Sequence, residues 1–237
     1  MTIEERIRYL IEDAISINRL TRMSCFILDF TNQRLLWKSD KLLFIDGVTE
    51  KLRTSINPYW EYTSDNTYSQ LSTISMELCR VVENRFTDKV AKLTCVVDYP
   101  VLCDGQEMYI SQETLLMLLP DIQANVMTEN LRIISFCTVN ISVTKSLSGL
   151  IVMSDGGIYK YDKRKGRFAE LPANIRLSDR EKSILSKTEE GYSPKEIAAK
   201  LCISDSTLKT HKSHIFHKLH THNIEETLDL ANKLHLM

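Results

Sequence analysis

Three helix-start signals follow one another between residues 176 and 237, and they constrain this chain more than any other feature. Two are S-x-x-E capping boxes, in which a serine hydroxyl and a glutamate three residues later satisfy free backbone amides of the first turn. The third is a serine N-cap that precedes a longer polar segment. The signals are Ser178 with Glu181, Ser193 with Glu196, and Ser204. The segment therefore predicts two short helices that lead into a third.

The intervals between these signals predict a helix-turn-helix. Pro194 takes a first-turn position, where its missing N–H costs nothing, and Gly191 stands where the first helix needs a left-handed closing residue. The helix from about Pro194 to Leu201 ends three residues before the next cap, so the chain must turn sharply at Cys202 and Ile203. A short helix, a tight turn and a longer helix is the layout that presents one helix to the major groove of DNA.

The third helix, expected from 205 to about 220, has two unlike faces. Its apolar stripe is Leu208, Ile215 and Leu219. The expected packing partners of that stripe are Ile184, Leu185, Ile197, Ala198 and Leu201. The opposite face carries short hydroxyl groups and cations without an acid, which suits phosphates and base-edge acceptors. That face comprises Ser206, Thr210, Ser213 and His217, flanked by Lys209 and His214.

The same residues resemble the LuxR-type (GerE-like) DNA-binding domain. The pattern of that family runs L-[ST]-x-R-E, a Gly, K-E-I-A, [IV]-S-x-x-T-[VL]-K-x-H and I-x-x-K-L. It is matched here at 177–181, Gly191, 195–198, 203–211 and 215–219. The resemblance implies that the third helix enters the major groove. It also implies a fourth helix, here over 223–236, that packs beside the first and often pairs two protomers.

The resemblance assigns roles to individual side chains. Nearest the bases it places Lys209, Thr210 and Ser213. Nearest the phosphates it places Lys195, Ser206, Thr207 and Lys212. Because Thr210 and Ser213 are short, part of the base readout is expected to pass through water. The family usually continues N-R after the third helix, whereas this chain has Asn223-Ile224, which removes a salt-bridge partner and puts the local geometry in doubt.

Five histidines crowd the end of this segment: His211, His214, His217, His220 and His222. They can add positive charge near or below the ordinary histidine pKa of about 6.5. A metal site is disfavoured, because a three-residue spacing drifts by about 60° per step around a helix. No nearby carboxylate or cysteine completes a tetrahedral set either. We therefore expect no metal here.

Length and composition indicate two domains, since the helical segment takes only about 65 of the 237 residues. Hydrophobic content of 43% and charged content of 26% are ordinary for a globular protein, and the net charge is −1. DNA affinity must therefore come from the local placement of cations. The first 20 residues do not resemble a signal peptide, and no apolar run is long enough for a membrane span. Six irregularly spaced cysteines favour reduced thiols, so we expect a cytoplasmic protein.

The N-terminal part predicts a mixed α+β domain. An amphipathic helix capped by Thr2 and Glu5 comes first, followed by a hairpin over 25–38. Short helical turns are expected near 40–46 and 49–54, and a longer helix over 64–86. Strands are expected at 92–102, from about 107, and at 131–142, 149–153 and 157–161, with 115–127 ambiguous. The basic run from Lys163 to Pro172 predicts a linker, which divides the chain into domains at 1–162 and 176–237 with a linker at 163–175.

This order of elements, two strands, small helices, one connecting helix and three antiparallel strands, is that of a PAS domain. The segments CFILDFTNQRLLWKS and SFCTVNIS resemble most clearly the PAS sensor modules that precede LuxR-type domains in some bacterial regulators. The resemblance implies a five-stranded sheet against short helices, with a pocket that holds a small ligand or is filled by side chains. No histidine precedes His211, which excludes a His-ligated haem in this part, and no flavin motif is present. We therefore expect no cofactor.

Three classes of function can be weighed on these residues. An enzyme is disfavoured, because the N-terminal part has no histidine and Asp98 with Asp104 are interpreted as solvated loop acids. A signalling adaptor, with both domains serving protein contacts, is the alternative, but Lys209 and Lys212 favour DNA binding. The prediction is a homodimeric, sequence-specific transcription regulator with an N-terminal domain for sensing or dimerisation. Its two third helices would lie in successive major grooves about 34 Å apart. The helix at 223–236, the N-terminal helix and the sheet all stay open as the dimerising element.

Overall fold

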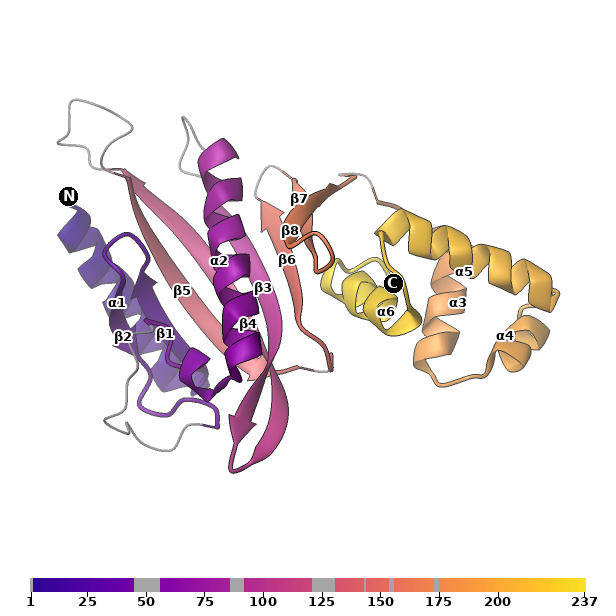
Figure 1. Ribbon diagram of the computed structural model, residues 1–237, viewed down its shortest axis with the longest axis horizontal. Coiled ribbons are helices and arrows are strands. Elements are labelled where there is room, and N and C mark those ends of the chain that lie inside the picture. The colour runs from indigo at the N-terminus through magenta and orange to yellow at the C-terminus, as the bar shows by residue number, and fades with distance from the viewer. Residues whose placement is uncertain are drawn as a thin grey trace. The chain divides into compact units, whose positions relative to one another are not determined.

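A computed structural model of the protein describes residues 2–44, 56–85, 92–120, 131–142, 144–153, 156–172 and 175–237. The chain divides into two compact units, Met1–Glu170 and Leu171–Met237. The first is a β-sheet with helices and the second is helical (Figure 1). Parts of the turns expected at 40–46 and 149–161, all of the one at 49–54, and residues 121–127 of the ambiguous stretch lie outside the described residues.

The strands of the first unit form one sheet in the order β2-β1-β5-β4-β3-β6-β7-β8, with antiparallel pairing from β2 through β7. Their bounds are β1 Ser24–Asp29, β2 Arg34–Lys38, β3 Lys92–Cys103, β4 Gln106–Pro120, β5 Leu131–Ile141, β6 Ser148–Met153, β7 Ile158–Asp162 and β8 Arg167–Leu171. The predicted hairpin and strands are therefore present, and residues 115–120 belong to β4. The β3–β4 turn consists of Asp104 and Gly105, both at positive φ (49° and 77°), as a two-residue hairpin turn requires.

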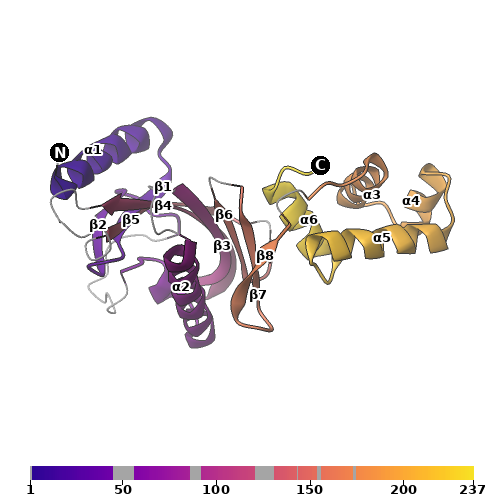
Figure 2. The ribbon, with the colours of Figure 1, turned by 90° about the horizontal axis from the view of Figure 1, so that it is seen from above.

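Two long helices cover opposite faces of this sheet (Figure 2). Helix α1, Ile3–Thr21, buries Ile7 and Ala14 against Ile27 of β1 and Ile134 of β5. Helix α2, Asp65–Arg85, buries a stripe in the larger core on the other face, together with Phe26 and the short 3-10 helix η1, Trp60–Tyr62. That stripe is Leu71, Ile74, Leu78 and Val82, whose steps of three and four residues place them on one face of the helix. Successive β1 side chains point to opposite faces, so Phe26 and Ile27 reach different cores.

The linker predicted at 163–175 is wrong for residues 163–171. The basic run forms the β7–β8 turn, where Asp162 accepts the backbone N–H of Arg164 at 2.9 Å. The ring of Phe168 in β8 is buried against Tyr161, with ring centroids 5.4 Å apart. Gly149 makes room for this contact, because a Cβ there would lie 3.0 Å from Tyr161 Cβ.

Among the described residues of this unit, Asp29 and Asp98 are buried. Asp98 is a correction, because it is not a solvated loop acid: it lies in β3, is 1% exposed, and accepts hydrogen bonds from Ser142 and Ser148. Asp29, at the end of β1, is fully buried and accepts from Arg132 through Nη2 (2.7 Å) and Nε (2.9 Å). Burial alone would raise the pKa of Asp29, but hydrogen bonds from Arg132 and from Asn32 outweigh burial and lower it.

The second unit contains α3 Asp179–Glu189, α4 Pro194–Lys200, α5 Asp205–Leu219 and α6 Ile224–Lys233. Its most buried side chains include Ile184, Leu185, Ile197, Leu208, Ile215 and Leu219, so the predicted stripe meets the predicted partners. Among the described helices of the chain, none is long and apolar enough to cross a membrane.

Candidate nucleic-acid interface

The three predicted caps open the three helices of the candidate interface. Ser178 and Ser193 each form a complete capping box with the glutamate three residues later, and Ser204 accepts the backbone N–H of Thr207 at 3.1 Å. Each cap satisfies an amide that would otherwise lack a partner at the helix start. The local sequence, through the cap at Ser204, therefore determines where α5 begins.

The turn between α4 and α5 is closed by backbone geometry and by one arginine. Cys202 adopts a left-handed conformation with φ 50°, and the N–H of Ile203 reaches the carbonyl of Ala198 at 3.0 Å. The guanidinium of Arg180, from α3, donates to the carbonyl of Leu201 at the end of α4. Arg180 thus ties α3 to the C-terminal end of α4, just before the turn.

A buried acid ties α3 to α5. Glu181 is 3% exposed, closes the α3 capping box, and accepts a hydrogen bond from Lys218 Nζ at 2.7 Å. Burial would raise the pKa of Glu181, but the bonds from Lys218 and Ser178 outweigh burial and lower it. Lys218 therefore has a structural role. The sequence shows the capping box but not this long-range ion pair.

The opposite side of α5 is exposed. The exposed side chains are Ser206, Thr207, Lys209, Thr210, Ser213, His214 and His217, and Lys195 is exposed on the first turn of α4. Lys212 is half-buried, because it lies three residues before the fully buried Ile215 and on the edge of the packed stripe. All three predicted base-facing residues are thus on the open surface, and so are three of the four predicted phosphate-facing residues.

Hydroxyl groups cluster at the start of α5. Ser204 Oγ lies 2.7 Å from Ser206 Oγ and 2.8 Å from Thr207 Oγ1. One turn later, Thr210 Oγ1 donates to the carbonyl of Ser206 at 3.1 Å. The hydroxyl proton of Thr210 is used inside the helix, so its oxygen faces outward as an acceptor. The partial positive charge of the helix start and its free amides suit a phosphate.

The segment before α6 is well defined despite the missing arginine. Asn223 accepts the N–H of Glu226 at 2.8 Å, and the Glu226 carboxylate accepts the N–H of His222 at 2.8 Å. The buried positions of α6 are Thr227, Leu230 and Ala231. One stripe of the helix predicted at 223–236, which could pair two protomers, comprises Ile224, Leu228, Ala231 and His235. Ala231 is not available for such pairing, because it faces the core of its own unit.

Residues 176–231 match the family model GerE, described as bacterial regulatory proteins of the luxR family. The C-terminal unit contains a LuxR-type helix-turn-helix domain. The match covers all four helices of the LuxR-type domain except the last turn of α6.

Curated relatives share this domain. A 73-residue stretch is 40% identical to the Fimbriae Z protein of Salmonella typhimurium, covering 31% of this chain and 33% of the relative. An 89-residue stretch is 33% identical to the CsgBAC operon transcriptional regulatory protein of Escherichia coli, covering 38% and 37%. The chain thus spans about a third of the length of these relatives. The solved structure of the Vibrio cholerae VqmA dimer without target DNA is 14% identical, with a TM-score of 0.34, over 94% of this chain and 88% of that one. A score this low does not establish a shared overall fold.

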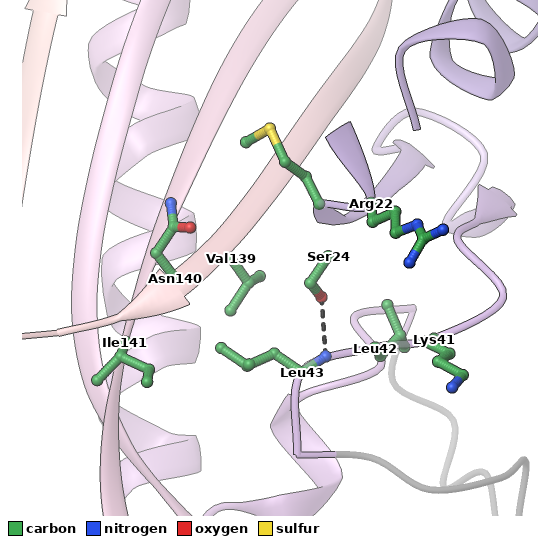
Figure 3. A pocket seen from close by; sticks show the side chains of 9 residues that line it. Arg22, Ser24, Lys41, Leu42, Leu43, Val139, Asn140 and Ile141 are labelled. Carbon is green, nitrogen blue, oxygen red and sulfur yellow. Dashed lines mark hydrogen bonds between the residues drawn. The ribbon is translucent and has the colours of Figure 1, made fainter. Parts of the chain in front are cut away.

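An open groove of about 460 Å³ lies in the first unit, at the end of α1 and β5 (Figure 3). Its floor is mainly apolar, and Arg22, Lys41 and Asn140 stand around it. The polar group on the floor, Ser24 Oγ, is already bonded to Tyr59 Oη at 2.6 Å and to the N–H of Leu43 at 3.0 Å. No group of three or more His, Cys, Asp or Glu residues within the described ranges could hold a metal ion.

Proposed function

We propose that this protein is a sequence-specific, DNA-binding transcription regulator. The observation that carries the proposal is the exposed, acid-free face of α5, held on a frame of three capped helices in a LuxR-type domain. In such a frame the third helix enters the major groove while the first two brace it against the backbone. Similarity to a relative named as an operon transcriptional regulatory protein supports the same conclusion.

Within this proposal, Lys209, Thr210 and Ser213 face the bases. Lys195, Ser206, Thr207 and Lys212 contact phosphates. Lys209 is the strongest candidate for direct readout, since a lysine can donate to guanine O6 and N7. Thr210 offers an acceptor, so it suits a donor such as the amino group of cytosine or adenine, directly or through water. Lys212 contributes least, because half of its side chain is already buried.

The first unit is proposed as a PAS-like module for sensing or dimerisation. Five neighbouring strands, β2-β1-β5-β4-β3, with α1 and α2 on their faces, support the PAS-like interpretation, while β6, β7 and β8 extend that sheet. The core between the sheet and α2 contains a hydrogen-bonded polar network centred on Gln112. Its Oε1 accepts from Tyr99 Oη at 2.7 Å and from Asn57 Nδ2 at 2.9 Å. Such a satisfied network favours an interior that side chains fill.

We further propose a cytoplasmic homodimer with domains at 1–162 and 176–237, the first extended by β8. Two copies would place their α5 helices in successive major grooves about 34 Å apart. This geometry predicts a palindromic operator whose half-sites lie one helical turn apart.

The test is selection of bound duplexes from a random pool by the full-length protein, followed by sequencing. We expect an enriched palindrome. Replacing Lys209 with alanine should weaken binding to that duplex by about 1–3 kcal/mol and relax the preference at one position of each half-site. Affinity should also fall steeply with salt, since much of the attraction is to phosphate.

The matched control is Lys182→Ala, which removes the same charge from the exposed side of α3. This variant should bind like the wild type. An equal loss in both variants, or an equal loss on all duplexes, would remove Lys209 from the base-reading set. No enrichment at low salt would favour the adaptor function instead.

A further inference from the structure

All six histidines of the chain lie between residues 211 and 235, inside the LuxR-type domain. Two of them, His214 and His217, are exposed on α5. We propose that binding of DNA is coupled to protonation of His214 and His217, so that affinity rises as the pH falls through neutrality. This inference rests on the proposed function, and it adds two residues to the DNA-facing surface.

The position of the two rings follows from helix geometry. His217 lies four residues after Ser213 and seven after Thr210, so the three side chains follow one line along α5, opposite the buried stripe. His214 lies four residues after Thr210, at the margin of the same face. A duplex that contacts Thr210 and Ser213 with the first half of α5 therefore passes close to both rings.

Neither imidazole has a hydrogen bond or ion pair within the described part of the protein. His217 only stacks beside His220, with ring centroids 6.4 Å apart. A protonated ring therefore finds no internal acceptor. A DNA phosphate that binds at this face supplies that acceptor.

The charged groups near His214 and His217 also leave phosphate as the acceptor for a protonated ring. On α5 itself the neighbours are the cations Lys209, Lys212 and Lys218, and the single acid, Asp205, is at the far end of the helix. Asp179 and Glu225 are exposed on the first turns of α3 and α6, and the six other acids on or beside α3, α4 and α6, which pack on α5, have partners of their own. These are Glu181 with Lys218, Glu189 with Asn232, Glu190 with Ser186, Glu196 with Ser193, Glu226 with the His222 amide, and Asp229 with Lys233.

The sign of the effect follows from linkage. Phosphate stabilises the charged imidazole, so the pKa of such a ring is higher in the complex than in the free protein. The gain in affinity is complete below the free value and is lost as the pH rises through the bound value. A ring that takes up about 0.4 of a proton on average when DNA binds strengthens binding about sixfold between pH 8 and pH 6. Two such rings give about 40-fold.

The experiment measures the dissociation constant of the full-length protein for the selected duplex at pH 6.0, 7.0 and 8.0 and fixed salt. We expect affinity to rise about 10- to 40-fold on acidification, with about 0.5–0.8 proton taken up on average. The double variant His214→Gln/His217→Gln should lose most of this rise. The control His222→Gln, an exposed histidine beyond the end of α5, should keep it.

A second variant, His217→Lys, places a permanent charge at the centre of the face. It should bind at pH 8 about as tightly as the wild type binds near pH 6.5, with a weaker pH dependence. Binding of the wild type that does not change with pH, or a pH dependence that survives in the double variant, would overturn the inference while leaving the proposed function intact. Absence of binding at every pH would instead contradict the proposed function and, with it, this inference.

Discussion

The two units of this protein are built by different kinds of contact. In the LuxR-type domain each helix starts at a cap that lies within three residues of the amide it satisfies. In the first unit, β5 lies between β1 and β4, so strands that are neighbours in the sheet are distant in the chain. Local signals therefore determine the elements of the helical unit. Pairing between distant segments determines the sheet.

The partners of the buried acids differ between the two units in the same way. Asp29 is held by Arg132 of β5, which lies 103 residues later in the chain. Glu181 is held partly by its own capping box and partly by Lys218. The comparison predicts that removal of a buried acid harms the sheet unit more than the helical unit.

The largest effect is expected from Asp29→Ala. This change leaves Arg132, which is only 12% exposed, without its main partner, and should lower the free energy of unfolding of the first unit by about 3 kcal/mol. The two tryptophans, Trp37 and Trp60, both lie in this unit, so their fluorescence during urea unfolding reports on it alone. The exposed acid Asp40 offers a control, and Asp40→Ala should change stability by less than about 0.5 kcal/mol. A small loss of stability in Asp29→Ala would show that water replaces the carboxylate as the partner of Arg132.

The second largest effect is expected at Glu181, whose contribution to stability depends on pH. Because the pKa of Glu181 is lowered in the folded state, the unfolded chain takes up the proton first as the pH falls. Its contribution is complete above the ordinary carboxyl value of about 4.3 and is lost as the pH falls through the folded value. Glu181→Gln should cost about 1–2 kcal/mol at pH 7, since Lys218 is 42% exposed and partly solvated. The variant should also remove this part of the acid sensitivity.

Far-UV circular dichroism of the full chain, compared with tryptophan fluorescence, separates the helical transition from that of the sheet. The exposed acid Glu225 gives the matched control, and Glu225→Gln should keep the wild-type loss of stability in acid. An identical pH profile for Glu181→Gln and the wild type would contradict the role of the Lys218 pair.

These contrasts also explain what the sequence could predict. The caps, the apolar stripe of α5 and the exposure of Lys209, Thr210 and Ser213 depend on residues within a turn or two of each other, and the sequence predicts all of them. The hairpins were predictable for the same reason, since their turns are short.

The features that the sequence did not predict depend on packing between residues that are far apart in the chain. Strand β8 has only five residues and is held by the contact of Phe168 with Tyr161 across from Gly149. The burial of Asp98 depends on its pairing with β6, opposite Ser148. The half-burial of Lys212 depends on how closely the neighbouring helices approach α5. In each case the deciding partner lies outside the local segment.

A smaller effect compares two equivalent caps in the two units. Thr2 and Ser178 form the same capping box, with Glu5 and Glu181 respectively. Thr2→Ala and Ser178→Ala should each cost about 1 kcal/mol. The loss should appear in tryptophan fluorescence for Thr2→Ala and only in circular dichroism for Ser178→Ala. A fluorescence change for Ser178→Ala would mean that the two units unfold together.

The smallest effect is expected at Cys202, and it has the opposite sign. This residue holds φ 50° in the turn before α5, a conformation that costs an L-residue free energy and that glycine adopts readily. Cys202→Gly should therefore stabilise the LuxR-type domain by about 0.5 kcal/mol, because the relief of strain exceeds the added freedom of the unfolded chain only slightly. Gly191 offers the reverse experiment, since its φ is 86° and no atom lies within 4 Å of the place that a Cβ would take. Strain alone should therefore make Gly191→Ala destabilising, by about 1 kcal/mol. Thermal unfolding by circular dichroism measures both, and a loss of stability in Cys202→Gly would mean that the cysteine side chain makes contacts worth more than the strain it carries.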